Sequence, residues 1–223
     1  MNIQQYLTER TRITDEFYGS AGAVSCHRGC SNCCYQMVAV TFADAWVLAA
    51  YVLALPAEER KGLLEAMERD YSIQAHEDHV SWLEYKRPCP FLASDGTCGV
   101  YGIRPVNCRQ VLSRASPDYC APDNLVALAK DLPTAGRPVI VPWNQMEPLA
   151  EMAQECMRPV LGLYGIDVDL TTAPLPMAVL ACVYTMVTGD AGALRSWAAS
   201  TRPMPQHRPT TDRTVCSQTT QAT

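Results

Sequence analysis

The stretch "CHRGCSNCC", residues 26–34, places four cysteines within nine residues and ends on an adjacent pair. Thiols at this density form a metal site, a disulfide knot or a redox device, and each of these constrains how the surrounding chain can fold. The stretch holds only four of the 11 cysteines in the sequence. The chemistry of the site therefore has to be judged together with the cysteines that follow.

The context of these thiols favours a metal site over disulfides. The N-terminal stretch "MNIQQYLTERTRITDEF" carries acids and bases but no apolar segment, so we expect no secretory signal. The longest apolar runs, 47–55 and 177–187, are about half the length of a membrane span. We therefore expect a cytoplasmic protein that does not enter a membrane. Thiols in a reducing cytosol are more often metal-binding or catalytic than paired in disulfides.

The net charge of −5 argues against nucleic acid as a partner, because binding to a duplex needs a basic surface. Local patterns instead predict a mainly α-helical chain with an irregular, loop-rich cysteine core and one short β-hairpin at the turn signal "SDG". A further short helix is expected in "IRPVNCRQVL", with Pro105 near its start. The longer helices are expected at 2–18, from the N-cap Thr41 to Pro56, and at 57–85, 122–132, 144–163, 175–188 and 190–199.

These elements suggest three parts. Residues 1–132 are predicted to form a cysteine-cluster metal-binding domain, and residues 133–200 a helical extension that packs on it. Residues 201–223 are polar and rich in proline and threonine, which predicts a disordered tail.

The candidate metal ligands form two blocks. In the first block the spacing is C-x3-C-x2-C-C, and short intervals of this kind let thiolates converge on one centre. In the second block the cysteines are separated by eight, nine and eleven residues. The eight candidates are Cys26, Cys30, Cys33, Cys34, Cys89, Cys98, Cys108 and Cys120.

The adjacent pair is the most informative part of this set. Neighbouring side chains point in different directions in both strands and helices, so Cys33 and Cys34 do not easily bind the same tetrahedral ion. They serve two centres, or hold different irons of one larger cluster, or one of them is not a ligand. Eight cysteines fit two four-thiolate centres, and equally one centre with supporting thiols; the sequence leaves this open.

The charge of such a site predicts cationic neighbours. Four thiolates around Zn²⁺, or around a four-iron cluster of charge 2+, leave a net charge of −2. Arg104 and Arg109 flank Cys108, and we expect both to donate charge-assisted hydrogen bonds to the sulfur atoms of the cofactor. Arg28 fits a solvated surface position equally well.

Other candidates receive simpler interpretations. Cys156 and Cys182 lie in apolar helical text and are expected to be buried small hydrophobic residues. Cys216, in the tail, is expected to be inert. His76 and His79 share a helix face, but without partner glutamates a solvated face is favoured.

The combination of motifs resembles a known family. "CHRGCSNCC" followed by "CPFL…GTCGVYGIRPVNCR" is similar to the YkgJ-like cysteine-cluster family, whose members are described as zinc- or iron-chelating. The specific signals are the doubled cysteine, Cys-Pro before an apolar pair, and Tyr-x-x-Arg-Pro-x-x-Cys-Arg at 101–109. The resemblance covers residues 26–120, and residues 133–223 match nothing recognisable. It implies metal binding, commonly as an iron–sulfur cluster.

Several functions remain open at this point. An all-cysteine set excludes Ca²⁺ and Mg²⁺, and it suits zinc, copper(I) and iron–sulfur centres. The uneven second block and the resemblance favour an iron–sulfur cluster, such as 4Fe–4S, over zinc. One alternative is a cluster-dependent protein-modifying enzyme like the flagellin lysine methylases, which carry a related cysteine motif. Another is a zinc-stabilised interaction or metal-delivery module. Whether the chain is an enzyme, and which protein partner or substrate it has, stay open.

Overall fold

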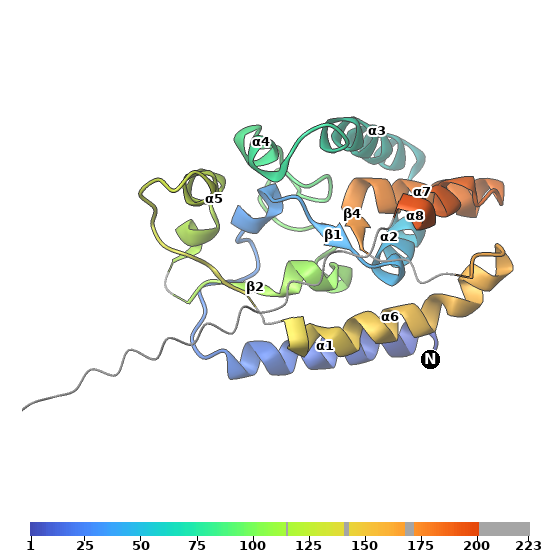
Figure 1. The fold of residues 1–223 in the computed structure, drawn as a ribbon, viewed down its shortest axis with the longest axis horizontal. Coiled ribbons are helices and arrows are strands. Elements are labelled where there is room, and N and C mark those ends of the chain that lie inside the picture. Colours follow the sequence, from blue (N-terminus) through green and yellow to red (C-terminus); the bar gives the residue numbers. More distant parts are fainter. Residues whose placement is uncertain (115, 141–142, 168–171, 201–223) are drawn as a thin grey trace, which may run out of the picture.

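The fold is mainly helical, as predicted. A computed structural model describes residues 1–114, 116–140, 143–167 and 172–200 (Figure 1). The predicted disordered tail and Cys216 lie outside the described residues. The helices are α1 (Ile3–Ser20), α2 (Phe42–Ala54), α3 (Ala57–Gln74), α4 (His79–Glu84), α5 (Pro122–Ala129), α6 (Trp143–Leu163), α7 (Leu175–Thr188) and α8 (Gly192–Ser200).

The cysteine-bearing part of the chain is irregular and contains four short 3-10 turns. They are η1 (Asn32–Tyr35), η2 (Tyr101–Ile103), η3 (Val106–Arg109) and η4 (Pro117–Cys120). The strands are β1 (Ala39–Val40), β2 (Val111–Leu112), β3 (Val139–Ile140) and β4 (Ala173–Pro174).

Helix α2 is the centre of the apolar core. Its start follows the prediction, because the Thr41 side chain accepts a hydrogen bond from the Asp44 backbone N–H at 3.1 Å, as an N-cap does. Leu48 and Val52 of α2 are fully buried, and α2 packs on α6 and α7. At its first residue, the ring of Phe42 meets Trp197 of α8 edge to face, with centroids 5.7 Å apart.

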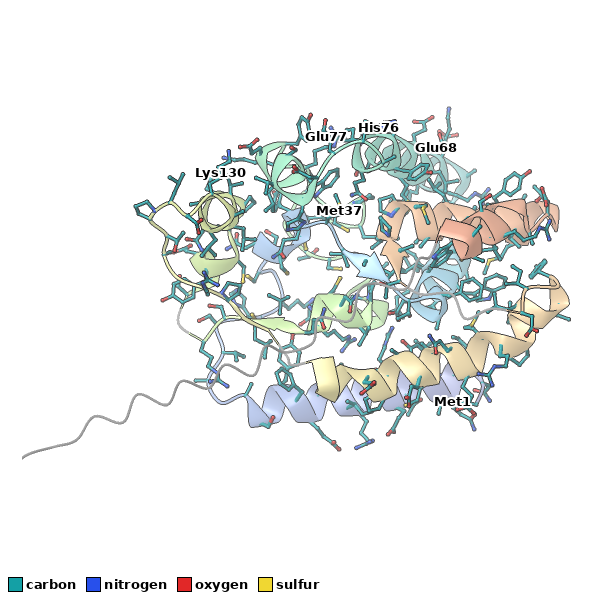
Figure 2. The ribbon with its side chains drawn as sticks, viewed as in Figure 1. Met1, Met37, Glu68, His76, Glu77 and Lys130 are labelled. Carbon is teal, nitrogen blue, oxygen red and sulfur yellow. The ribbon has the colours of Figure 1, made fainter. Side chains whose placement is uncertain are left out.

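Helices α1 and α6 pack side by side along one edge of the molecule (Figure 1). A capping box starts α1: the Asn2 side chain accepts from the Gln5 N–H, and the Gln5 side chain accepts from the Asn2 N–H. The terminal amine of Met1 reaches Glu155 of α6 at 3.1 Å, and Figure 2 shows Met1 beside α6. The N-terminal helix is therefore tied to the second half of the chain.

The single helix predicted at 57–85 is wrong, because two helices occupy this range. Helix α3 ends at Gln74, and α4 begins at His79 with Asp78 as its N-cap. The Asp78 carboxylate accepts the Ser81 N–H at 2.8 Å, so a capping aspartate supplies a new helix start inside an otherwise helical pattern. The apolar periodicity continued across this break and concealed it.

The short strands pair across large sequence distances. Strand β1 pairs antiparallel with β4, and β2 pairs antiparallel with β3. The turn signal "SDG" does form a tight turn, but it is flanked by one isolated bridge between Leu92 and Cys98 rather than by two strands. The predicted hairpin is thus reduced to a single bridged turn.

The core is continuous across residue 132, where we predicted a domain boundary. Met157 of α6 and Val179 of α7 belong to the same buried cluster as Leu48 of α2. The division into a metal-binding domain and a helical extension stays a prediction. Among the described residues, no helix combines the length and the apolar character that crossing a membrane requires.

Candidate metal centre

The eight candidate ligands all lie in the irregular segments between α1 and α5. The ten cysteines of the described chain are free thiols. Of the eight candidates, Cys120 is buried and the other seven are half-buried. Cys156 and Cys182, in contrast, are buried inside α6 and α7, which confirms their expected role as apolar core residues.

The first cysteine loop is held against the segment that ends at Cys120. The Asn32 side chain donates to the Pro117 carbonyl at 2.8 Å, which joins η1 to η4. Further back, the Ser25 N–H donates to the Ser113 carbonyl at 2.8 Å. The Ser113 N–H in turn donates to Cys26 Sγ at 3.3 Å. These contacts bring the start of the first block to the last cysteine of the second block.

The other end of the first block is joined to Cys89. The Cys89 N–H donates to the Cys34 carbonyl at 2.7 Å. Trp82 of α4 supports this junction, because its indole N–H donates to the Tyr35 carbonyl at 3.1 Å. The isolated bridge at Leu92 and Cys98 closes the loop that starts at Cys89. Residues from both blocks therefore meet at the adjacent pair.

The thiols influence one another electrostatically. Burial raises the pKa of Cys89 and of Cys120 to about 12, and it also raises the pKa of Cys30, Cys98 and Cys108. The charge of Cys33 adds to the rise at each of these five thiols. Cys33 is thus within electrostatic reach of members of both blocks.

Cys33 and Cys34 have opposite environments despite being adjacent. A hydrogen bond from the Cys34 thiol and, to a smaller extent, the positive charge of Arg104 lower the pKa of Cys33 to about 7 against the opposing effect of burial. The same hydrogen bond raises the pKa of Cys34, and burial and the charges of Cys33 and Cys89 add to this rise. The adjacent pair therefore contains one thiol that favours the thiolate and one that remains protonated without a metal.

Arg104 is held beside these thiols on an aromatic support. Its guanidinium lies 4.3 Å from the centroid of the Tyr101 ring, and its Nη2 donates to the Tyr18 hydroxyl of α1 at 3.3 Å. Cys33 and Cys108 are among the negative groups that raise its pKa against the opposing effect of burial. Its buried Nε–H has no hydrogen-bond partner among the described residues. The Arg104 Nε–H is therefore available to donate a hydrogen bond near the thiols.

Arg109 points elsewhere. Its Nη1 donates to Thr14 Oγ1 of α1 at 3.5 Å and lies 3.9 Å from the Asp15 carboxylate, and its Nη2 donates to the Gly102 carbonyl at 3.2 Å. Burial lowers the pKa of Arg109, and the positive charges of Arg104 and Arg10 lower it further. These hydrogen-bond and ion-pair partners are thus on α1 and η2 rather than on the cysteines.

The donor set suits a soft metal, although the side chains are not arranged around one. Within the described ranges, no three histidine, cysteine, aspartate or glutamate side chains are positioned to hold a metal ion together. Thiolates are the ligands that zinc and iron–sulfur centres share, and the unpartnered Arg104 Nε–H is the type of donor that a negatively charged thiolate centre accepts. The residues therefore fit a thiolate-bound metal by their chemistry rather than by the present arrangement of their side chains.

Sequence reasoning missed the groups that hold the Cys108 turn. The Asp44 carboxylate, fully buried, accepts the Val106 N–H at 3.1 Å, two residues before Cys108. In the sequence, an acid three residues after the N-cap Thr41 is typical of a helix start, and this pattern gives Asp44 no other role. The available signal was its charge within the otherwise apolar helix that follows Thr41, because an acid in such a position needs a buried partner.

The two histidines proposed as a solvated face are both exposed. Figure 2 shows His76 on the outer surface of the molecule, with Glu68 and Glu77. Both histidines are therefore solvated, as expected, but they do not share a helix face, because α3 ends at Gln74 and α4 begins at His79.

The fold and the site together define a class: a mainly helical protein with a thiol-rich, loop-built site for a soft metal. Residues 25–124 match the family model described as "CxxCxxCC: Putative zinc- or iron-chelating domain". The match confirms the resemblance and supports metal binding through the cysteines. No curated protein and no solved structure matches the chain.

Proposed function

We propose that the chain is a metal-binding protein that holds an iron–sulfur cluster through its loop cysteines. The ligands in this proposal are Cys26, Cys30, Cys33, Cys34, Cys89, Cys98, Cys108 and Cys120. One observation carries the proposal. Two cysteine blocks far apart in sequence meet at Cys33 and Cys34, beside a buried guanidinium N–H that has no partner among the described residues.

The preference for iron–sulfur over zinc rests on how the ligands are distributed. Compact zinc modules take their ligands from closely spaced pairs, whereas iron–sulfur clusters accept thiolates from long and uneven intervals. In the second block, Cys98 lies in a bridged turn, Cys108 in η3 and Cys120 in η4. A bound cluster would supply one-electron transfer at this position.

The adjacent cysteines have different roles in this proposal. The Cys34 carbonyl is bonded to the Cys89 N–H, so Cys34 belongs with Cys89, Cys98 and Cys108. Asn32, the residue before Cys33, is bonded to the turn that ends at Cys120. Cys33 therefore belongs with the thiols at that end of the site. The proposal therefore has two sets of ligands, which adjoin at Cys33 and Cys34.

Arg104 and Arg109 contribute positive charge in different ways. Arg104 donates its free Nε–H to a ligand sulfur, while Tyr101 and Tyr18 hold the rest of its guanidinium. Charge-assisted hydrogen bonds of this kind stabilise thiolate and sulfide charge. Arg109 acts at longer range, because its own hydrogen bonds hold it against α1. The cytoplasm, where thiols stay reduced, is the compartment that this proposal requires.

The test is anaerobic purification of the full chain, followed by a visible absorption spectrum and analysis of iron, acid-labile sulfide and zinc. We expect a brown protein with iron and sulfide in stoichiometric amounts. A colourless protein that holds only zinc contradicts the cluster and leaves zinc as the metal. A protein with no bound metal contradicts both.

A further inference from the structure

The buried face of α1 carries polar side chains. Tyr6, Arg10, Thr14 and Tyr18 recur at every fourth position, so they lie on one side of the helix. The first three are buried, with Arg10 only 1% exposed. A helix that serves only to cover a core buries an apolar stripe, so this face calls for a different explanation. The family match begins at residue 25 and gives this helix no role.

The first contact of this face reaches the Cys108 turn through α2. Tyr6 Oη donates to the Asp44 carboxylate at 3.2 Å, and Arg10 Nη1 donates to the same oxygen. The other oxygen of Asp44 accepts the Val106 N–H at 3.1 Å. Arg10 thus neutralises a fully buried carboxylate that holds the first residue of η3. Burial of such a charge is tolerated only when it is paired and hydrogen-bonded.

The next two turns of α1 hold the arginines on either side of Cys108. Thr14 Oγ1 accepts from Arg109 Nη1 at 3.5 Å. The Tyr18 hydroxyl accepts from Arg104 Nη2 at 3.3 Å. Helix α1 and η3 are in direct contact. Side chains from successive turns of α1 therefore contact a single segment, residues 101–109, either directly or through Asp44.

We propose that α1 is a positioning element of the metal centre, which sets where Cys108 and Arg104 stand relative to the other thiols. The inference rests on the proposed function. The polar side chains of α1 hold the segment 101–109 in place and thereby slow the loss of metal. This effect is separate from any contribution that they make to overall stability. Outer-shell groups that orient ligands in this way commonly change metal affinity by about 10–100-fold when removed.

The test uses two substitutions that remove hydroxyls and keep shape, combined as Thr14→Val with Tyr18→Phe. The control is Arg12→Ala, an exposed residue of the same helix that forms ion pairs with Glu9 and Glu16 of that helix. Thr14→Ser, made as a single substitution, keeps the hydroxyl and serves as the conservative control. Asp44→Asn is the stronger variant. It leaves Arg10 buried without its ion pair, so this variant can fail to fold. The variants at Thr14 and Tyr18 keep the test usable in that case.

Two quantities are measured on the full chain. One is the rate at which the native metal passes to excess EDTA. The other is amide hydrogen exchange of residues 101–109 and of α7 in the metal-free protein. For the double variant we expect metal transfer about tenfold faster than in wild type and faster exchange in 101–109, with α7 unchanged. Arg12→Ala and the single substitution Thr14→Ser should behave as wild type.

Two outcomes overturn the inference: metal transfer equal to that of Arg12→Ala, or equal acceleration of exchange in 101–109 and α7, which indicates a loss of global stability alone. If wild type binds no metal, the proposed function fails separately. Exchange in the metal-free chain then decides whether α1 holds this segment: no change in 101–109 overturns the inference, and a local change supports the holding contact.

Discussion

The two halves of the molecule use cysteine in opposite ways. In the helical core, Cys156 and Cys182 are buried among apolar side chains of α6 and α7, where burial raises the pKa of Cys156 to about 11. In the loops, seven cysteines are half-buried on segments whose only regular elements are short 3-10 turns, two-residue strands and one isolated bridge among the described residues. The core is therefore stabilised by packing, whereas the loops need another source of stability. We propose a bound metal as that source, because metal-binding energy in such sites is also folding energy.

The largest effect is expected from Cys33→Ser. Cys33 is within electrostatic reach of thiols from both blocks, so its loss should remove the metal and unfold the loops while the helices remain. Metal analysis and circular dichroism measure the two effects. Retention of the full metal content by this variant would exclude Cys33 as a ligand and break the comparison between the two halves.

Leu48→Ala should produce the reverse pattern. Leu48 is fully buried at the centre of the core, and truncating such a residue typically costs about 2–5 kcal/mol of stability. Chemical denaturation should show this loss while the folded protein keeps its metal content. Loss of metal from protein that is still folded would show that the two halves are not energetically separable.

Arg104→Gln should have a smaller and local effect. The variant removes the guanidinium charge and its free Nε–H but keeps a polar side chain. We expect about tenfold faster metal loss to a chelator. Arg114→Gln, at an exposed position near the same loops, is the matched control and should leave the rate unchanged. Equal rates in the two variants would assign Arg104 to packing on Tyr101 alone.

Cys182→Ala is the smallest change. Removing one buried sulfur should cost about 1 kcal/mol of stability, as is usual for single substitutions, with no change in metal content. The thermal midpoint and metal analysis of the same sample check both statements. Any fall in metal content in the folded variant would show that a core cysteine takes part in the site.

The comparison also explains how much could be predicted from the sequence. The class of fold, the start of α2 at Thr41 and the burial of Cys156 and Cys182 were predictable because they depend on local caps and apolar runs. The cysteine blocks were recognisable because their spacing is itself the signal. These features depend on local sequence patterns or on the residue types themselves.

The remaining features depend on tertiary pairing, which no local pattern encodes. The pairing of β1 with β4 joins segments more than a hundred residues apart. The break before α4 was hidden because Asp78 is an ordinary polar residue until its carboxylate caps a helix. Likewise, Asp44 looked like a helix-start residue, and only the fold brings Arg10 and the Val106 N–H to it.

The central claim is that the eight loop thiols bind a metal and the two core thiols do not. The most direct measurement is alkylation of each cysteine, followed by mass spectrometry, on native protein before and after metal removal by a chelator. We predict that the eight loop cysteines are protected before removal and become reactive after it. Cys156 and Cys182 should stay protected by packing in both states. Equal reactivity of the loop cysteines before and after chelation would contradict the account.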